Sequence, residues 1–297
     1  MKQKHFLAAL FAFWVGLSDA QQVADTAFSF RNPTPHRPAG AGSVVWLDEA
    51  HSNFHTLDGR YATFGKVLRE DGYRVAPNRQ AFTAANLAGY RILVIANALD
   101  TASAGAKGWQ LPTPSAFSAA EVAAVNAWVK NGGRLFLIAD HMPFAGSAQD
   151  LARSFGVEYL NGFAMDNRNR NTERFFRGNK TLFDCDATRQ VDTVVTFTGS
   201  AFTLPKGAQP VLGLRDYTVL LPDAAWQFVE NTPHRDSRGL YQLGYLSYGK
   251  GKVVVSGEAA MFSAQLAGPN RNPVGMNQPE ARQNARLLLN LMEWLDR

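Results

Sequence analysis

Cysteine is nearly absent from this sequence: Cys185 is the only one in 297 residues. A single thiol cannot form a disulfide within the chain, so no cross-link of that kind stabilises the fold. The free energy of folding must come from buried apolar side chains, and a chain of this length with 46% hydrophobic residues can bury enough of them. The composition indicates a globular protein with a sizeable core.

The common phosphate-binding and nucleophile motifs are also absent. No Gly-x-Gly-x-x-Gly follows the first predicted strand, and the chain has no Gly-Lys-Ser/Thr of the Walker type and no Gly-x-Ser-x-Gly. These absences argue against a dinucleotide-binding fold, nucleotide triphosphate chemistry and an ordinary serine esterase.

Neither sign of charge is in large excess, since the net charge is only +5. The most basic stretch, residues 166–180, includes Phe175 and Phe176 between its charges. Such a run can contact an anionic polymer, but a solvated loop is the favoured interpretation. We therefore expect no nucleic-acid partner.

The first twenty residues have the pattern of an export signal. Basic residues 1–4 precede the apolar run 6–17, and small residues follow at 18–20. The run is too short to span a bilayer comfortably, and no later stretch is apolar enough, so we expect no stable membrane insertion. The sequence predicts cleavage near Ala20, a Pro-rich arm over residues 21–42 and a periplasmic or secreted protein.

From residue 43 onward, apolar strands alternate with amphipathic helices. The pattern predicts strands at 44–47, 73–75, 91–96 and 134–139, and helices at 58–71, 119–130 and 147–155. A capping box at Ser118 and Glu121 opens the second of these helices. This alternation is typical of an α/β fold with a doubly wound, flavodoxin-like and mostly parallel sheet. We expect a single domain over residues 43–297.

The second half of the chain is less regular. Residues 157–235 carry long polar connections and only short candidate strands, at 193–197 and 217–221, which predicts an irregular insertion or an antiparallel extension of the sheet. A hairpin turning at 249–251 leads into a buried strand at 253–255. A helix over residues 280–295 closes the domain.

Polar side chains follow four of the predicted strands. They are Asp48 and Glu49 after the first, Asn97 after the third, Asp140 and His141 after the fourth, and Glu258 after the last. Ligands of open parallel sheets bind outside the carboxyl ends of the strands. The sequence therefore predicts one polar crevice at this edge.

Two histidines indicate that this crevice binds a metal ion. His51 and His55 are four apart, a spacing that places two imidazoles on one side of a helical turn. With Asp140 and His141 they would form a nitrogen and oxygen ligand set suited to zinc, manganese or iron.

A carboxylate outside the metal shell would then be the general base on bound water, and the candidates are Glu49 and Glu258. The remaining polar and aromatic residues near the strand ends are candidates for substrate binding. They are Asp48, Asn53, Asn97 and Phe144.

Each of these residues also has a structural alternative. Asp48 or Asn53 would cap the next helix, His141 would bond its own loop, and Glu258 would pair with an arginine. The cluster as a whole favours a functional site over separate structural roles.

The stretch "AWVKNGGRLFLIADH" and the ending "YGKGKVVVSGEAAMFS…NARLLLNLMEWL" resemble the class I glutamine-amidotransferase-like superfamily. The likeness is to its non-amidotransferase branches, the ThuA-like proteins and exported domains of unknown function, and it covers residues 43–160 and 240–295. In true amidotransferases a nucleophilic Cys follows the strand that here leads to Asp140 and His141, so we expect no glutamine amidotransferase activity. The link of ThuA-like proteins to carbohydrate metabolism implies a sugar ligand.

Three hypotheses follow. The first is an exported, metal-dependent hydrolase or lyase acting on a small or carbohydrate-like substrate. The second is a non-catalytic domain of the cell envelope that binds a sugar or peptide in the same crevice. The third is a structural domain whose polar cluster only caps and bonds the backbone. The sequence leaves the oligomeric state open.

Overall fold

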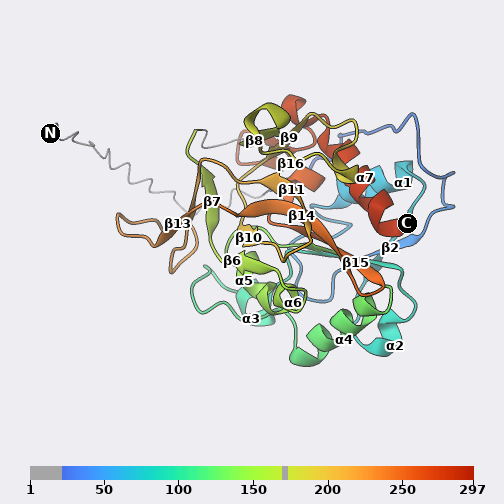
Figure 1. The fold of residues 1–297 in the computed structure, drawn as a ribbon, viewed down its shortest axis with the longest axis horizontal. Coiled ribbons are helices and arrows are strands. Elements are labelled where there is room, and N and C mark those ends of the chain that lie inside the picture. The colour runs from blue at the N-terminus through green and yellow to red at the C-terminus, as the bar shows by residue number, and fades with distance from the viewer. Residues whose placement is uncertain (1–21, 169–172) are drawn as a thin grey trace.

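The computed structural model describes residues 22–168 and 173–297. Its main feature is a nine-stranded mixed sheet with the order β3-β2-β4-β5-β15-β14-β10-β6, in which β11 also pairs with β14 (Figure 1). The strands are β2 (Val44–Asp48), β3 (Arg74–Asn78), β4 (Ile92–Ala96), β5 (Arg134–Ile138), β6 (Glu158–Leu160), β10 (Ala201–Thr203), β11 (Gln209–Gly213), β14 (Tyr241–Tyr248) and β15 (Gly251–Ser256).

Five neighbouring strands, β3, β2, β4, β5 and β15, run parallel to one another. The other four, β14, β11, β10 and β6, add to this block by antiparallel pairing. The predicted α/β fold with a mostly parallel sheet is therefore confirmed. The strand order reverses between β2 and β4, so the connections leave in opposite directions at that point.

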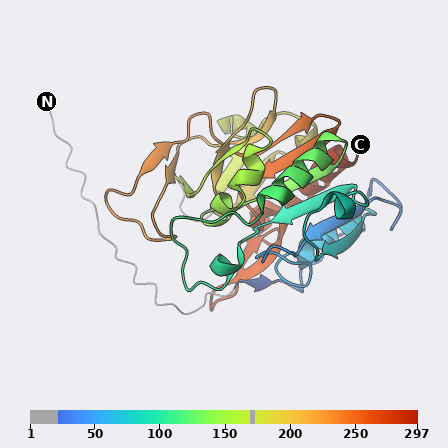
Figure 2. The same ribbon diagram turned by 90° about the horizontal axis from the view of Figure 1, so that it is seen from below.

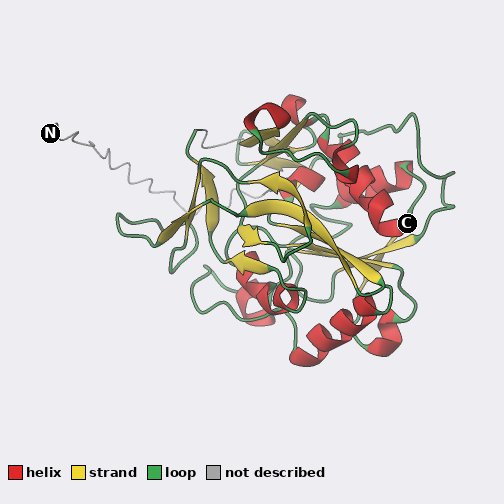
Figure 3. Ribbon diagram, in the orientation of Figure 1, coloured by secondary structure: helices red, strands yellow, loops and turns green. Residues whose placement is uncertain are grey.

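Helices cover both faces of the sheet (Figure 3). On one face lie α1 (Ala62–Glu70) and α7 (Asn284–Asp296), and on the other lie α2 (Ala84–Leu87), α4 (Ala119–Lys130), α5 (Phe144–Ser147) and α6 (Gln149–Arg153). β4 is buried on both sides because its side chains alternate: Val94 joins the first core, while Leu93 and Ile95 join the second. None of the helices in residues 22–168 and 173–297 is long and apolar enough to cross a membrane.

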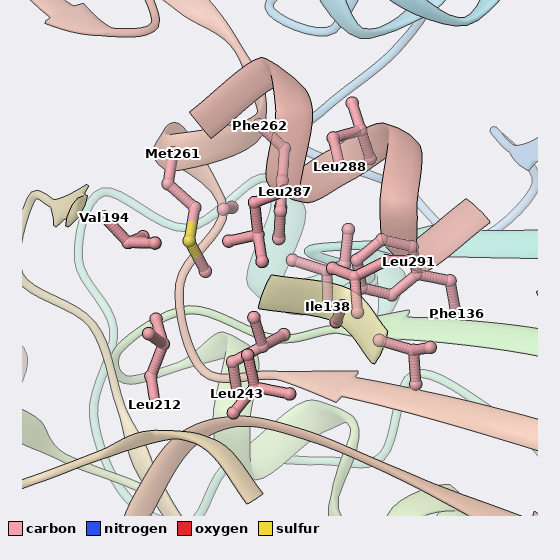
Figure 4. Close-up of a cluster of buried hydrophobic side chains, with 14 of the residues drawn as sticks. Phe136, Ile138, Val194, Leu212, Leu243, Met261, Phe262, Leu287, Leu288 and Leu291 are labelled. Carbon is pink, nitrogen blue, oxygen red and sulfur yellow. The ribbon is translucent and has the colours of Figure 1, made fainter. Parts of the chain in front are cut away.

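The core under α7 joins distant parts of the chain. Figure 4 shows Phe136 and Ile138 of β5 packed toward Leu287 and Leu291 of α7, with Phe262 beside them. All five side chains are fully buried. Burial of each such side chain stabilises the fold by about 1.5–3 kcal/mol relative to exposure, which offsets the missing disulfide.

Several element boundaries differ from the predicted ones. The capping box of Ser118 and Glu121 is present and α4 has the predicted bounds. In contrast, α1 begins at Ala62 rather than residue 58, because residues 56–61 form turns in which the Thr56 carbonyl accepts bonds from the Gly59 and Tyr61 amides.

Two further helices differ from the prediction, because each is divided into two parts. The helix predicted over 147–155 is two short helices, α5 and α6. The C-terminal helix begins with a separate 3-10 turn, Pro279–Ala281, and α7 follows it.

The irregular region predicted at 157–235 extends the sheet and adds two smaller ones. β7 (Phe163–Asp166), β12 (Tyr217–Leu220) and β13 (His234–Asp236) form a three-stranded sheet, while β8 (Glu173–Phe176) pairs with β9 (Thr193–Thr196). The strands predicted at 193–197 and 217–221 correspond to β9 and β12. In Figure 2 the β12–β13 hairpin lies beside the loop that follows α3 (Thr101–Ala104).

The segment between residue 22 and the main sheet is held against the domain. β1 (Val23–Ala24) pairs with β16 (Ala264–Ala267), which also pairs with β17 (Asn272–Gly275). Further along, the His36 Nδ1 atom lies 2.8 Å from Asp71 and an Arg37 guanidinium nitrogen lies 2.7 Å from Asp296. The predicted export signal at residues 1–20 lies outside the described residues.

Candidate functional site

A cavity of about 570 Å³ lies at the carboxyl ends of the central parallel strands. Its wall includes segments that follow β2, β4, β5, β9 and β15, and it also includes the β16–β17 ribbon. The main lining side chains are Phe54, His55, Arg60, Asn97, Trp109, Asp140, His141, Phe144, Thr198, Trp226 and Gln265. Five of the ten predicted site residues are among them: His55, Asn97, Asp140, His141 and Phe144.

Asn97 joins the ends of two strands at this edge. It has a left-handed backbone conformation with φ of 48°, which Asn tolerates better than most residues. Its amide N–H donates to the Ile138 carbonyl at 3.0 Å, and its side-chain oxygen accepts from the Asp140 amide at 2.9 Å. Asn97 therefore fixes the position of Asp140 relative to the sheet.

Asp140 is the acidic group of the cavity. Its side chain accepts a bond from the His141 backbone N–H at 2.8 Å. Burial raises the pKa of Asp140, and the nearby His141 and the hydrogen bonds to Asn97 and His141 oppose this only in part. A carboxyl group in this state can act as a proton donor as well as an acceptor.

The ring of His141 is held in one orientation by a hydrogen bond and by aromatic neighbours. Its Nδ1 atom lies 2.8 Å from the Met142 carbonyl, which accepts from an N–H. Its ring stacks on Phe163 with 4.7 Å between ring centres and meets Trp226 edge-on at the same distance. The neutral ring with its proton on Nδ1 therefore has Nε2 as its basic nitrogen.

Glu258 lies behind the cavity wall. It is fully buried and accepts bonds from the backbone N–H groups of Ala260 and Met261 at 2.8 and 2.7 Å. Burial raises its pKa well above the usual range, and the nearby Asp140 carboxylate raises it further. Two carboxyl groups that influence each other in this way do not ionise independently, so the charge of Glu258 changes the proton affinity of Asp140.

A third buried carboxyl group, Glu173, belongs to the same electrostatic neighbourhood. Thr196 donates its hydroxyl to Glu173 at 2.6 Å. Burial, followed by smaller effects of Asp166 and Asp140, raises the pKa of Glu173 to about 7. The sequence prediction missed this residue because it lies in the irregular region, where no strand end marks a site.

His51 faces away from the cavity. Its Nδ1 lies 2.8 Å from Asp48 and its Nε2 lies 2.9 Å from Glu121. Burial alone would lower the pKa of His51, but the two carboxylates raise it. An imidazolium donating from both nitrogens fits this arrangement, and such a ring has no lone pair for a metal ion.

The other polar residues of this loop also bond within the protein. Glu49 accepts from the Leu57 backbone N–H at 2.9 Å and faces Arg79 at 3.3 Å. The Asn53 side-chain oxygen accepts from the His51 backbone N–H at 3.0 Å. None of Asp48, Glu49, His51 and Asn53 lines the cavity, and these contacts fix the course of the loop.

His55 is the histidine of this loop that reaches the cavity wall. It is only 3% exposed, and its Nδ1 atom has no hydrogen-bond partner in the described part of the chain. Burial, helped by the charge of Arg60, lowers the pKa of His55 to about 3. The ring packs edge-on against Tyr61 with 4.5 Å between ring centres. His55 is therefore neutral at physiological pH.

Two tryptophans that the sequence prediction missed complete the wall. Trp109 and Trp226 come from separate loops, which are joined by backbone bonds from Leu111 to Asp223 and from Ala225 to Trp109, both 2.8 Å. Phe144 packs against Trp109 with 5.5 Å between ring centres. No local pattern in the sequence indicates that these two loops meet.

The predicted metal ligands do not converge as a set. His55, Asp140 and His141 line one cavity, whereas His51 is bonded to two carboxylates elsewhere. Among residues 22–168 and 173–297 no three His, Cys, Asp or Glu side chains are grouped closely enough to hold a metal ion as they stand. The geometry thus leaves three separate candidate ligands at the cavity.

Comparison with known proteins gives likeness of fold only. No family matches the sequence, and no curated protein matches it either. Among solved structures, the mmIFT52 N-terminal domain has a TM-score of 0.58 with 14% identity, over 85% of this chain and 97% of that chain. The cytoplasmic protein STM1381 from Salmonella typhimurium LT2 has a TM-score of 0.52 with 14% identity, over 86% and 99%.

A ThuA-like protein from Bacteroides uniformis is a more distant neighbour, with a TM-score of 0.49 and 12% identity over 89% of this chain and 95% of that chain. The resemblance of the sequence to the amidotransferase-like superfamily stays a prediction. At 14% identity, the likeness to the first two structures is one of fold alone.

Proposed function

We propose that the cavity binds a small, carbohydrate-like molecule and that Asp140 and His141 perform acid–base chemistry on it, as in a hydrolase or lyase. The observation that carries this proposal is that a buried carboxyl group of raised pKa and the imidazole of the next residue line the same aromatic-walled cavity. Such a combination is typical of an acid–base site.

The lining side chains favour a ligand rich in hydroxyl groups. Four of them have a buried polar atom without a partner in the described part of the chain: His55 Nδ1, Arg60 Nε, Asn97 Nδ2 and Gln265 Oε1. This set contains both donors and an acceptor, and a hydroxyl group both donates and accepts. The aromatic rings of Trp109, Phe144 and Trp226 supply flat apolar walls for the faces of a ring-shaped ligand.

The place of the cavity agrees with a flavodoxin-like sheet. In chain order the parallel strands have the spatial sequence 2-1-3-4-5, and ligands of such sheets bind at the point where the strand order reverses. We assign the sheet to this arrangement. From the pattern of residues 1–20 we also propose that the protein is exported, either to the periplasm or out of the cell.

The proposal is tested by screening sugars and glycosides for binding and turnover, with Asp140→Asn as the key variant. We expect a loss of turnover of about a hundredfold or more, because a general acid or base contributes that much. Asp150→Asn is the matched control, since Asp150 is an exposed residue of α6 outside the cavity. Equal turnover by both variants would contradict the role of Asp140.

Non-catalytic binding is the alternative outcome of the same screen. Ligand binding that depends on Asn97 and Trp226, with no turnover in any condition, would assign the chain to the binding class.

A metal-dependent form of the proposal rests on His55, Asp140 and His141. Zinc, manganese or iron would find imidazole and carboxylate ligands there. Elemental analysis of protein purified without chelator tests this form: metal at one equivalent that is lost in His141→Gln and kept in His51→Gln would support it. Metal that is absent from all three proteins would leave acid–base chemistry by the side chains alone.

A further inference from the structure

Arg60 brings to the cavity a positive charge that the proposed acid–base chemistry does not use. Its guanidinium carbon lies 3.8 Å from the centre of the Phe54 ring, and one terminal nitrogen donates to the Phe54 carbonyl at 3.2 Å. Its Nε atom is buried and has no partner in the described residues. The side chain is therefore fixed in one place while part of its bonding capacity stays unused.

Among the described residues, no carboxylate balances the charge of Arg60. No carboxylate of the described residues lies within 4.0 Å of it: Asp58 is exposed and faces Arg79, and Glu49 is bonded to Arg79 and to the Leu57 amide. The charge nevertheless acts on the cavity, because it contributes to the low pKa of His55. A half-buried cation without a counter-ion is costly, which points to a partner that arrives with the ligand.

The helix that follows adds to the positive potential. α1 begins two residues after Arg60, has no acidic residue in its first turn, and its N-cap residue Tyr61 makes no side-chain bond to the helix. The amino end of a helix carries partial positive charge. Both features favour an anion near Arg60.

The number of cations limits the charge of that anion. Arg60 is the only Lys or Arg among the described residues that line the cavity. One guanidinium matches one carboxylate in charge and in its paired N–H geometry, whereas a phosphate dianion would be left half neutralised beside the Asp140 carboxyl group. The cavity is thus suited to a monoanion.

We infer that Arg60 forms a carboxylate-binding subsite of this cavity and that the ligand is an acidic sugar of the uronate class. The inference rests on the proposed function, because the remaining polar side chains are assigned to the hydroxyl groups of the same ligand. The carboxylate binds at the Arg60 and His55 side, and neutral His55 does not repel it.

The test is a titration followed by the tryptophan fluorescence of the protein, to which Trp109 and Trp226 of the cavity contribute. D-glucuronate and D-galacturonate are compared with D-glucose and D-galactose at low salt. Two smaller probes are included, the monocarboxylate D-erythronate and the neutral polyol erythritol. We expect wild-type protein to bind the uronates at least about tenfold more tightly than the neutral sugars, since bonds to charged groups are worth that much.

Arg60→Met should abolish this preference, Arg60→Lys should keep part of it, and Arg69→Met should leave it unchanged. Arg69 is an exposed residue of α1 outside the cavity, so its variant removes the same charge without removing a lining side chain. Thermal unfolding of each variant checks that the fold is intact.

The outcomes separate the two proposals. Equal affinity for uronates and neutral sugars, unchanged in Arg60→Met, would overturn the subsite and leave the carbohydrate function standing. Binding of D-erythronate that depends on Arg60, without binding of any sugar, would support the subsite and overturn the carbohydrate ligand. Binding of none of the probes by wild-type protein would overturn both.

Discussion

The two ends of the loop after β2 place histidines in opposite electrostatic environments. His51 lies between the Asp48 and Glu121 carboxylates, which raise its pKa. His55, four residues later, is buried without a partner at Nδ1 in the described part of the chain, and its pKa falls to about 3. The first ring links β2 and α4 through two carboxylates, and the second is a neutral part of the cavity wall.

The difference shows that residue type alone does not assign a role. An imidazole with both nitrogens bonded to carboxylates has no free position for chemistry, whereas an imidazole with an unused nitrogen beside a cavity has one. The same contrast separates Glu49, which holds the loop, from Asp140, which lines the cavity. The candidate site is thus recognised by polar atoms that make no hydrogen bond within the described part of the chain.

The largest expected effect that separates the two histidines is on stability. We expect His51→Gln to lower the free energy of unfolding by about 3 kcal/mol, because it leaves the fully buried Asp48 carboxylate without its charged partner. His55→Gln should cost less than about 1 kcal/mol at pH 7, since no hydrogen bond to Nδ1 from the described residues is lost. Urea unfolding of both variants measures the two changes in the free energy of unfolding. Equal changes would contradict the structural role of His51 and the unbonded state of His55.

The next largest effect is on the free energy of unfolding below pH 6.5. An unfolded histidine binds a proton near pH 6.5, whereas folded His55 does so only near pH 3, so unfolding takes up a proton between these values. Stability should therefore fall as the pH falls, by about 2 kcal/mol from pH 6.5 to 5 through this group.

The His55→Gln variant should lack this part of the pH dependence when both proteins are unfolded in urea at several pH values. A difference between wild type and variant that does not change with pH would show that His55 is charged or exposed in the folded protein.

The smallest effect is on stability above pH 6.5. Here stability should fall as the pH rises, which is opposite to the effect of His55. The raised pKa of His51 means that the folded protein keeps this proton above pH 6.5, where the unfolded chain releases it. The contribution of His51 is complete below pH 6.5 and is lost as the pH rises through the pKa of the folded protein. NMR titration of the two imidazoles checks both directions in one experiment, and a lowered pKa for His51 would be the contrary result.

The sequence predicts the edge of the sheet at which the cavity lies. Asn97, Asp140 and His141 follow β4 and β5 directly, and parallel strands bring their carboxyl ends to one edge. Positions this close to a strand end have little freedom, so their approximate place follows from the strand pattern alone.

The loops are the part that the sequence does not determine. The helical spacing of His51 and His55 suggested a common face, but the segment between them is not helical, and Ser52 has a φ of 45°. Glu121 was predicted only as a capping-box residue. One of its oxygens caps the helix while the other bonds His51 across 70 positions of chain, a pairing that no local pattern encodes.

Arg60 and the two tryptophans were missed for a similar reason. Arg60 lies in turns that local pattern assigned to a helix, and Trp226 reaches the cavity only because its loop bonds to the loop of Trp109. Contacts of this kind depend on how two irregular segments pack, and that is decided by the whole fold.

A crystal structure of the protein with the tightest-binding sugar of the titration panel would show whether the cavity beside Asp140 is the binding site. We predict a single ligand in the cavity, with a hydroxyl group within hydrogen-bond distance of the Asp140 carboxyl group and a ring face against Trp109 or Trp226. A ligand bound at the His51 side of the loop, or sugar binding that leaves this cavity empty, would contradict it.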